Sequence, residues 1–341
     1  MSKVCPVFIP FAGCVNKCLY CDQSSLTGLS QSEVIQSAIS QIESVTSSGS
    51  FSKIAFFGGS FTCLSSELRQ TMYRISREYG FKQIRVSTRP DCINKDIIDE
   101  LKMNCVTEVE LGIQTLNDIA LSINLRPYDG NKALKSLQMS CENFYTVAQI
   151  MPGLYGDSSG EFLSGFEKIL SFKPHGFRIY PTVVFKKTPL EKYYKDGKYT
   201  PLTLSEALQI SLYCAAGCIN NGIEILRSGI PTENLDYSDI AAGPFHPAFG
   251  DLLRTLALML YFSESGNNII SAKNSSRMAG YKSLVKKLSL YKIADENKID
   301  QLEMPHVYKF IREQFIEGNF RLFEGQTNYF AEILQDKAHY R

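Results

Sequence analysis

Short apolar runs alternate with amphipathic segments along the first 230 residues of the chain. Each run is rich in Ile, Val and Phe, and in the segment that follows it the apolar residues return every three or four positions. The first pattern predicts buried strands and the second predicts helices that cover them. The predicted strands are Val4–Ile9, Lys53–Phe57, Gln83–Thr88, Glu108–Gln114, Thr146–Met151, Gly176–Phe185 and Ile223–Ile230.

Polar residues indicate where several of the helices begin. Ser30 and Glu33 have the spacing of a capping box, in which each side chain accepts a hydrogen bond from the other residue's backbone. A helical stripe follows it, made of Val34, Ile35, Ala38, Ile39, Ile42 and Val45. The pattern further predicts capping boxes at Ser158/Glu161 and Thr203/Glu206, helices from about Asn94 to Met103 and Asn131 to Asn143, and a loop from Lys186 to Pro201.

Strict alternation of strands and helices predicts a parallel sheet with its helices outside. Six strand–helix units and a seventh strand favour an α/β fold of the partial (β/α)6 TIM-barrel type, with a doubly wound open sheet as the alternative. In a barrel, the loops that follow the strands lie on one face, which carries the chemistry.

The alternation stops near residue 250, so we expect two parts. Residues 1–250 form the barrel, and residues 251–341 form a small α+β accessory region. In that region the pattern predicts a helix from Asp251 to Phe262, a short strand from Asn268 to Ala272 and a lysine-bearing helix from Ser276 to Leu288.

Composition narrows the class of protein. The chain has 341 residues, 44% of them hydrophobic and 21% charged, with a formal net charge of +1, which is ordinary for a globular protein. No apolar run reaches the length of about 18 residues that a membrane span needs, and the N-terminus does not resemble a signal peptide. We therefore expect a cytoplasmic protein whose ten cysteines are all reduced thiols. The near-neutral charge gives no general attraction to nucleic acid.

Three cysteines follow the first predicted strand on one short loop. Cys14, Cys18 and Cys21 are spaced by three and then two residues, and Gly13 allows a sharp turn before them. Thiolates in this arrangement bind a soft metal, either zinc or an iron–sulfur cluster. A zinc site usually closes with four protein ligands, and the sequence contains no second CxxC pair or spaced His pair to complete one. Three cysteines on a cubane cluster leave one iron open, so the count favours a cluster over zinc, and both over buried core cysteines.

With Tyr20 before the last cysteine, this loop resembles the cluster loop of the radical S-adenosylmethionine (radical SAM) superfamily. The resemblance implies that Cys14, Cys18 and Cys21 are the metal ligands and catalytic residues of a [4Fe–4S] cluster. It implies that the open iron binds S-adenosylmethionine, whose reductive cleavage gives a 5′-deoxyadenosyl radical that abstracts hydrogen from a substrate. It also implies a six-stranded partial barrel. Tyr20 is expected to pack on the cofactor's adenine, with a place in the apolar core as the alternative.

Glycines follow the second predicted strand. Gly58, Gly59 and Ser60 stand where exposed backbone can approach a ligand closely. A glycine pair at a strand end often marks only a turn. Placed one unit after the cysteine loop, however, the segment resembles the superfamily motif whose backbone holds the amino group of S-adenosylmethionine.

Polar residues also follow the third and fourth strands, and one lies within the sixth. Arg89 is expected to bind the cofactor's carboxylate or ribose, or else to form a salt bridge with Asp91. Gln114 suits the ribose hydroxyls, with a strand-end cap as the alternative. Arg178 alternates with apolar residues on a buried strand, where it needs an anionic partner, and the cofactor or substrate is favoured over an internal carboxylate.

A wider set of motifs narrows the resemblance to one branch. Phe57–Phe61, Ser87–Asp91, Val109–Gln114, Arg178–Pro181, Thr188–Glu191 and Lys198–Leu202 together resemble the radical domain of the Elongator catalytic subunit, and more closely its short bacterial relatives that lack the acetyltransferase domain. The match runs from about residue 5 to 250. Two departures stand out, at Asn124–Tyr128 and Gly153–Asp157, where the relatives usually carry Arg-Gly-His and Gly-Leu-Pro-Gly-Asp.

The resemblance suggests tRNA or another RNA as the substrate, and flavodoxin or ferredoxin as the type of electron donor. Basic residues of the accessory region agree with an RNA substrate, although a solvated helix face explains them as well: Lys273, Arg277, Lys282, Lys286 and Lys287. The alternatives are a radical SAM enzyme acting on a small molecule or peptide, and a non-catalytic iron–sulfur carrier or redox sensor. No membrane partner is expected.

Overall fold

The computed structural model describes residues 3–9, 12–14, 17–21, 30–233, 235–266, 269–271, 278, 280–283, 290, 292–294 and 303–317. Its described elements divide between two compact units. The first consists of Met1–Ile150, Leu154–Phe177 and Val184–Thr200, and the second of Met151–Gly153, Arg178–Val183 and Pro201–Arg341. The boundary predicted at residue 250 from the sequence pattern stays a prediction.

Seven parallel strands form one curled, open sheet in the order β1-β2-β3-β4-β5-β6-β8. These strands are β1 (Val4–Phe8), β2 (Lys53–Phe57), β3 (Gln83–Thr88), β4 (Val106–Gln114), β5 (Tyr145–Ile150), β6 (Gly176–Ile179) and β8 (Glu224–Ser228). The order follows the chain without the reversal that defines a doubly wound sheet, and the first and last of the seven are not neighbours. The predicted partial barrel is therefore confirmed.

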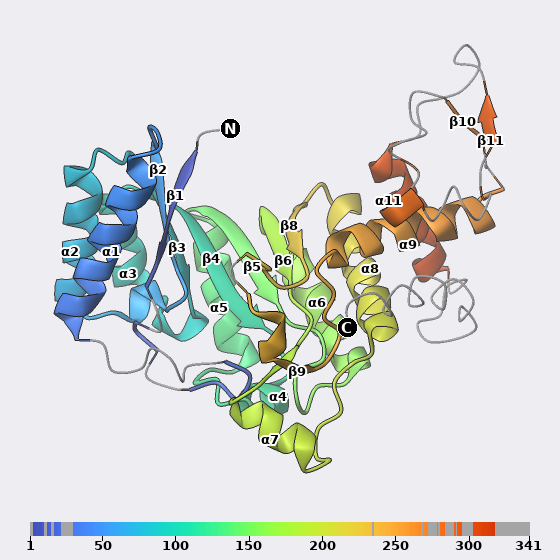
Figure 1. Cartoon of the computed structure of the whole chain (residues 1–341), viewed down its shortest axis with the longest axis horizontal. Helices are drawn as coiled ribbons and strands as arrows, with labels where there is room; N and C mark the ends of the chain where they lie inside the picture. The colour runs from blue at the N-terminus through green and yellow to red at the C-terminus, as the bar shows by residue number, and fades with distance from the viewer. Residues whose placement is uncertain are drawn as a thin grey trace. The chain divides into compact units, whose positions relative to one another are not determined.

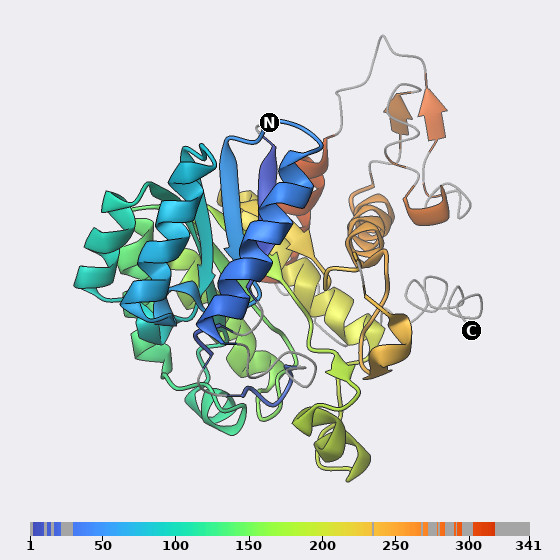
Figure 2. The same ribbon diagram turned by 60° about the vertical axis from the view of Figure 1, so that its left-hand side comes forward.

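Parallel pairing aligns the strand ends in the first unit. Val4 pairs with Lys53, Lys53 with Gln83, and Phe8 with Phe57. Figures 1 and 2 show α1, α2 and α3 beside this part of the sheet, and α1 packs against β1. Because the strands run in the same direction, the loops after β1, β2, β3 and β4 leave the sheet at one edge.

The helices of the first unit are α1 (Gln31–Thr46), α2 (Ser66–Glu78), α3 (Lys95–Met103), α4 (Asp118–Ile123), α5 (Gly130–Cys141), α6 (Ser159–Ser171) and α7 (Pro189–Lys195). The Ser30/Glu33 capping box is complete, as predicted. At α6, Ser158 accepts from the Glu161 backbone, but the Glu161 carboxylate binds the Ser158 hydroxyl and Asn117, so that box is half formed.

In the second unit, α8 (Leu204–Asn220), α9 (Phe249–Glu264) and α11 (Met304–Ile316) share one apolar core. Large buried side chains of this core include Leu208, Leu212, Leu256, Met259, Val307 and Ile311. The Thr203/Glu206 capping box that begins α8 is complete, as predicted. The short strands β9 (Ile240–Ala242), β10 (Ile269–Ser271) and β11 (Lys292–Ala294) complete the set of strands in this unit's described residues.

Three local expectations were wrong. The strand predicted at Gly176–Phe185 ends at Ile179, before Pro181, which lacks the N–H of a strand residue, and β7 covers only Val184–Phe185. The loop predicted after it contains α7, which Thr188 caps. Of the helix predicted at 276–288, the described Tyr281–Ser283 segment is a 3-10 turn with Lys282 at φ 47°, and most of the rest lies outside the described residues.

The cysteines give a further correction. Eight are free, as expected, but Cys63 and Cys92 form a disulfide. They lie in two single-turn 3-10 segments, η1 (Phe61–Cys63) after β2 and η2 (Pro90–Cys92) after β3. Pairing of those two strands brings the cysteine Cα atoms to 5.3 Å. None of the described helices has the length and apolarity needed to cross a membrane.

A buried ion pair between α2 and α3 makes stability pH-dependent. Arg69 donates from Nε and Nη2 to Glu100, each at 2.7 Å, and these bonds hold the pKa of Glu100 below its usual range. A carboxyl with a lowered folded-state pKa stabilises the fold above its unfolded-state pKa, and the stability is lost as the pH falls.

We therefore expect Glu100→Gln to lower the free energy of unfolding by about 1.5–3 kcal/mol at pH 7, measured by urea denaturation. The difference in the free energy of unfolding between the variant and the unsubstituted protein should narrow as the pH falls below 4.5, the ordinary pKa of glutamate. Glu78→Gln, which removes an exposed partner of Arg74, is the control and should change stability by less than about 0.5 kcal/mol. If Glu100→Gln lowered the free energy of unfolding by the same amount at pH 7 and below pH 4.5, the stabilising role of the Arg69–Glu100 ion pair would be contradicted.

Candidate active site

The cysteine loop follows β1 directly. The backbone N–H of Cys21 donates to the carbonyl of Cys18 at 3.2 Å, which closes a turn between them. Cys18 is buried, Cys14 and Cys21 are half-buried, and none of the three is in a disulfide. Cys14 Sγ lies 3.5 Å from Ser60 Oγ, so the loop meets the segment that follows β2.

The three loop sulfurs are not gathered as the ligands of one ion. Among the described residues, the one group of three ligand atoms within 4.8 Å of one another belongs to Cys63, Asp91 and Cys92. In that group the two sulfurs are bonded to each other, so they offer no metal site in this state. A cubane cluster takes each thiolate on a different iron, and wider spacing of Cys14, Cys18 and Cys21 therefore suits a cluster better than zinc.

Gly58 and Gly59 pack against the first strand and the cysteine loop. Gly58 has φ +89°, and a Cβ there would overlap the ring of Phe8. A Cβ on Gly59 would lie 2.8 Å from the carbonyl oxygen of Ile9 and closer still to that of Ala12. Ser60 also donates its N–H to Ala12 at 2.9 Å. Glycine is thus required here for the backbone of one loop to lie against the other.

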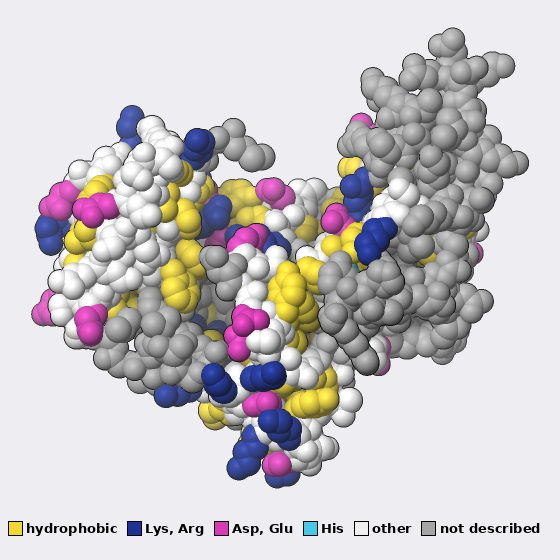
Figure 3. Space-filling model, viewed as in Figure 1, with side chains coloured by type: hydrophobic (Ala, Val, Ile, Leu, Met, Phe, Trp, Pro, Cys, Tyr) yellow, Lys and Arg dark blue, Asp and Glu magenta, His cyan; other side chains and the backbone are white. Residues whose placement is uncertain are grey.

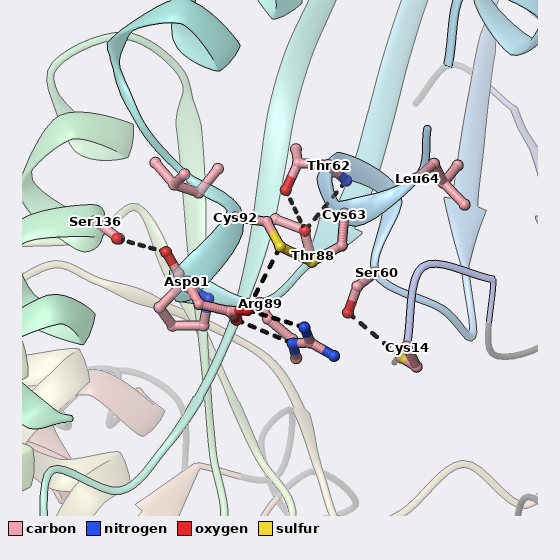
Figure 4. The surroundings of a disulfide bond; sticks show 12 residues. Cys14, Ser60, Thr62, Cys63, Leu64, Thr88, Arg89, Asp91, Cys92 and Ser136 are labelled. Atoms are coloured by element: carbon pink, nitrogen blue, oxygen red, sulfur yellow. Dashed lines mark hydrogen bonds and ion pairs between the residues drawn. A yellow bond between two sulfur atoms is a disulfide. The ribbon is translucent and has the colours of Figure 1, made fainter. Parts of the chain in front are cut away.

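Arg89 lies beside this contact, at the end of β3. Its Nε and Nη2 donate to the two carboxylate oxygens of Asp91, each at 2.9 Å, which confirms the salt bridge that the sequence offered as one alternative. Arg89 is 6% exposed, and its Nη1 has no hydrogen-bond partner among the described residues. Figure 4 shows the guanidinium between Asp91 and the Ser60–Cys14 pair.

The charge of Arg89 is maintained by its surroundings. Burial works against the positive charge, but the hydrogen bonds and charge of Asp91 outweigh that effect and raise the pKa of Arg89 above its ordinary value. The guanidinium is therefore a fixed cation with one N–H group still to be satisfied. A buried donor of this kind is costly unless a ligand or water pairs with it.

Gln114 ends β4 in a backbone conformation that residues other than glycine rarely adopt. Its φ is +68°, and the pairing of β4 with β5 shifts register between Gly112 and Gln114. Gln114 is 5% exposed, and its Oε1 accepts no hydrogen bond from the described residues. Strain of this kind costs about 1–3 kcal/mol and concentrates at functional sites.

Arg126 and Tyr128 were not singled out from the sequence as site residues. Arg126 donates from Nη1 to Cys18 Sγ at 3.4 Å and from Nη2 to the carbonyl of Gly112 at 2.7 Å. Tyr128 donates to the same carbonyl at 2.7 Å, and burial raises its pKa to about 12 against the opposing effect of Arg126. Arg126 thus holds a buried cation against one sulfur of the cysteine loop. The available signal was the departure at Asn124–Tyr128.

Two predicted site residues remain: Tyr20, which interacts electrostatically with Arg126 and Cys18, and Arg178. Tyr20 has a buried hydroxyl without a partner among the described residues, and burial raises its pKa. Arg178 donates from Nη1 to the Tyr180 hydroxyl at 3.1 Å and belongs to the second unit. A cavity of about 620 Å³ opens beside the cysteine loop, lined by Lys17 and by residues of the segment from Asp118 to Asp129, including Arg126.

Comparison with known protein families decides the family of the chain. The model of the radical SAM superfamily matches residues 8–168, and the model of the Radical_SAM C-terminal domain matches residues 174–257. The chain belongs to the radical SAM superfamily. Enzymes of this superfamily use a [4Fe–4S] cluster and S-adenosylmethionine and require a reductant, so this radical SAM protein is an enzyme with those cofactors.

Its relatives agree with the branch inferred from the motifs. The radical SAM protein is 33% identical over 133 residues to a tRNA uridine(34) acetyltransferase of Methanocaldococcus jannaschii, covering 38% of this chain and 24% of that one. It is 31% identical over 135 residues to Elongator complex protein 3 of Mus musculus, covering 37% and 24%. The chain thus matches about a quarter of the length of these relatives.

A solved structure has the same fold. The archaeal Elp3 of Methanocaldococcus infernus, with its N-terminus deleted, superposes with a TM-score of 0.55 at 19% identity, covering 78% of this chain and 64% of that one. The radical SAM domain described above also has side chains that fit the two cofactors. They comprise three free thiols on one loop, one buried cationic donor and one buried acceptor without partners among the described residues.

Proposed function

We propose that Cys14, Cys18 and Cys21 hold the [4Fe–4S] cluster and that Tyr20, Gly58, Gly59, Ser60, Arg89, Gln114 and Arg178 hold S-adenosylmethionine. The observation that carries this proposal is the contact of 3.5 Å between Cys14 and Ser60 beside the unsatisfied N–H of Arg89. That contact supports a cluster ligand and a binder of the cofactor's carboxylate within one small region.

Each chain residue has a separate task in this proposal. When bound, the cluster and S-adenosylmethionine supply a 5′-deoxyadenosyl radical that abstracts hydrogen from the substrate. Arg89 binds the carboxylate through Nη1 while Asp91 fixes its orientation. Gln114 accepts a hydrogen bond from a ribose hydroxyl through Oε1, Tyr20 packs on the adenine, and Arg178 binds an anionic group of the cofactor or substrate. Arg126 orients the Cys18 side chain by donating to its sulfur.

RNA is the substrate class that we propose first. The relative from Methanocaldococcus jannaschii is named as a tRNA uridine(34) acetyltransferase. The described surface also offers a basic segment around α7, where Lys186, Lys187, Lys192, Lys195 and Lys198 are exposed and the acidic residues are Glu191 and Asp196. Figure 3 shows Lys and Arg side chains gathered there. Of the accessory-region basic residues, only Lys282 lies within the described residues.

A substitution in the α7 segment tests the RNA proposal. Lys186, Lys187 and Lys192 changed together to Glu should weaken the binding of bulk tRNA by tenfold or more and flatten its salt dependence, because phosphate contacts release counterions. Gel-shift titrations at two salt concentrations measure both. Lys95 and Lys102 on α3, changed to Glu, are the control. If the α7 and α3 variants bound tRNA equally well, the result would favour the second candidate substrate. This is a small molecule or peptide that binds in the cavity of about 620 Å³.

The proposal includes an electron donor of the flavodoxin or ferredoxin type and a cytoplasmic location. Its decisive test is anaerobic loading with iron and sulfide, followed by dithionite and S-adenosylmethionine. We expect release of 5′-deoxyadenosine and methionine. RNA, peptide and small-molecule fractions of a cell extract, added in turn, should then identify the class that raises the rate. A fully loaded protein that releases no 5′-deoxyadenosine with any fraction would contradict the proposed enzyme and favour a cluster carrier.

A further inference from the structure

The disulfide joins two turns of the proposed cofactor site. Cys63 ends η1 and Cys92 ends η2, and both side chains are half-buried rather than enclosed. Two hydrogen bonds independently join η1 to the last residue of β3, just before η2, because Thr62 Oγ1 and Thr88 Oγ1 lie 2.6 Å apart and the Thr62 N–H donates to Thr88 Oγ1 at 3.3 Å (Figure 4). Breaking the S–S bond would therefore leave the turns connected.

Cys92 also touches the partner of Arg89. Its Sγ lies 3.5 Å from Asp91 Oδ2, the oxygen that accepts from Arg89 Nη2 at 2.9 Å. A disulfide sulfur carries no proton, so this approach is a contact and not a hydrogen bond. A free Cys92 thiol has a proton to donate to the same oxygen. The oxidation state of Cys92 thus determines whether Asp91 Oδ2 accepts a hydrogen bond from Cys92 in addition to the one from Arg89.

We propose that Cys63 and Cys92 are a reversible dithiol–disulfide switch for the cofactor site. The inference rests on the proposed role of Arg89 in binding S-adenosylmethionine. In the disulfide form Asp91 Oδ2 accepts from Arg89 Nη2 without a competing donor on Cys92. In the dithiol form Cys92 shares Asp91 Oδ2, which leaves more of the guanidinium's charge available to an anion beside Nη1. The reduced protein therefore binds the cofactor's carboxylate more tightly.

The redox step balances with a dithiol as the reductant. One of its thiolates attacks Cys63 or Cys92, the S–S bond breaks, and a mixed disulfide forms. The second thiol of the reductant then displaces the protein sulfur, so the protein gains two electrons and two protons and the reductant becomes a disulfide. A low-molecular-weight disulfide reverses the exchange. An enzyme that depends on an external reductant would in this way bind S-adenosylmethionine when its surroundings are reducing.

The first measurement uses the full-length protein in anaerobic thiol–disulfide buffers of graded ratio. Free thiols are alkylated, and the Cys63 and Cys92 peptides are quantified by mass spectrometry. We expect both cysteines to convert together and reversibly while the protein stays folded by circular dichroism. A disulfide that never forms, or that is reduced only when the protein unfolds, would overturn the proposal without bearing on the cluster.

The second measurement compares cofactor affinity in the two states by equilibrium dialysis of cluster-loaded protein, with the cluster's absorbance checked in every sample. We expect the reduced protein to bind S-adenosylmethionine about five- to tenfold more tightly than the oxidised one. The affinity of the Cys63→Ser/Cys92→Ser variant for S-adenosylmethionine should not depend on the thiol–disulfide ratio of the buffer. Cys105→Ser/Cys141→Ser, which changes two free cysteines, should behave like the unsubstituted protein.

The outcomes separate the two proposals. Equal affinity in both states, with S-adenosylmethionine bound and cleaved, would overturn the switch and leave the proposed function intact. A dependence on the buffer that persists in Cys63→Ser/Cys92→Ser would assign the effect to another group and also overturn it. Binding in neither state by a fully loaded protein would contradict the proposed function, and the switch with it.

Discussion

Replacing Cys18 by alanine should abolish iron–sulfur cluster binding and 5′-deoxyadenosine formation while the protein stays folded. Cys18 is buried, and its sulfur accepts from Arg126 at 3.4 Å, so its loss removes the proposed cluster ligand together with its contact with Arg126. Changes to residues that only support a metal ligand already reduce metal affinity or activity by about 10- to 100-fold. We expect a larger loss for the ligand itself, measured as iron content after anaerobic loading and as product by chromatography.

Cys105→Ala is the matched control, because Cys105 is an exposed free thiol at the start of β4. It should load and react like the unsubstituted protein. Cys14→Ala and Cys21→Ala should reproduce the Cys18 result. A Cys18→Ala protein that holds a full cluster and cleaves S-adenosylmethionine would show that the ligands lie elsewhere.

Replacing Arg89 by glutamine should weaken S-adenosylmethionine binding by about 10- to 100-fold with the cluster still in place. The substitution removes a buried cation whose Nη1 has no partner among the described residues, and a hydrogen bond between charged groups is among the strongest that a protein makes. Equilibrium dialysis against cluster-loaded protein measures the affinity, and iron content confirms the loading.

Arg85→Gln separates this effect from a loss of ion pairing on the same strand. Arg85 also lies on β3 and binds Glu108 and Glu110, but it is not at the end of the strand. We expect Arg85→Gln to lower stability and to leave cofactor affinity unchanged. If both variants lost affinity equally, the role of Arg89 would be structural.

The strands that were predicted accurately from the sequence each end at a clear boundary in the residue pattern. Lys53–Phe57 and Gln83–Thr88 were predicted to the residue because a glycine turn or an Arg-Pro pair follows each apolar run. In the run from Gly176 to Phe185 the boundary is Pro181, but apolar residues continue on both sides of it, so the strand was predicted too long. The helix α7 was missed because seven residues are too few to show a helical period.

The site was predictable only where its chemistry is local in sequence. The spacing of Cys14, Cys18 and Cys21 predicts a cluster loop without any knowledge of the fold. The contact of Arg126 with Cys18 joins residues 108 positions apart, and the Cys63–Cys92 bond joins turns of two neighbouring strands. Such pairs depend on strand register and loop direction, which no single stretch of the sequence specifies.

The account depends most on an iron that Cys14, Cys18 and Cys21 leave open to the cofactor. Electron–nuclear double resonance of the reduced cluster, with S-adenosylmethionine labelled by ¹⁵N at its amino group and ¹⁷O at its carboxylate, tests that claim directly. We predict hyperfine coupling from both labels in the unsubstituted protein. An intact, reduced cluster that shows no coupling to either label, at a cofactor concentration where binding is saturated, would contradict it.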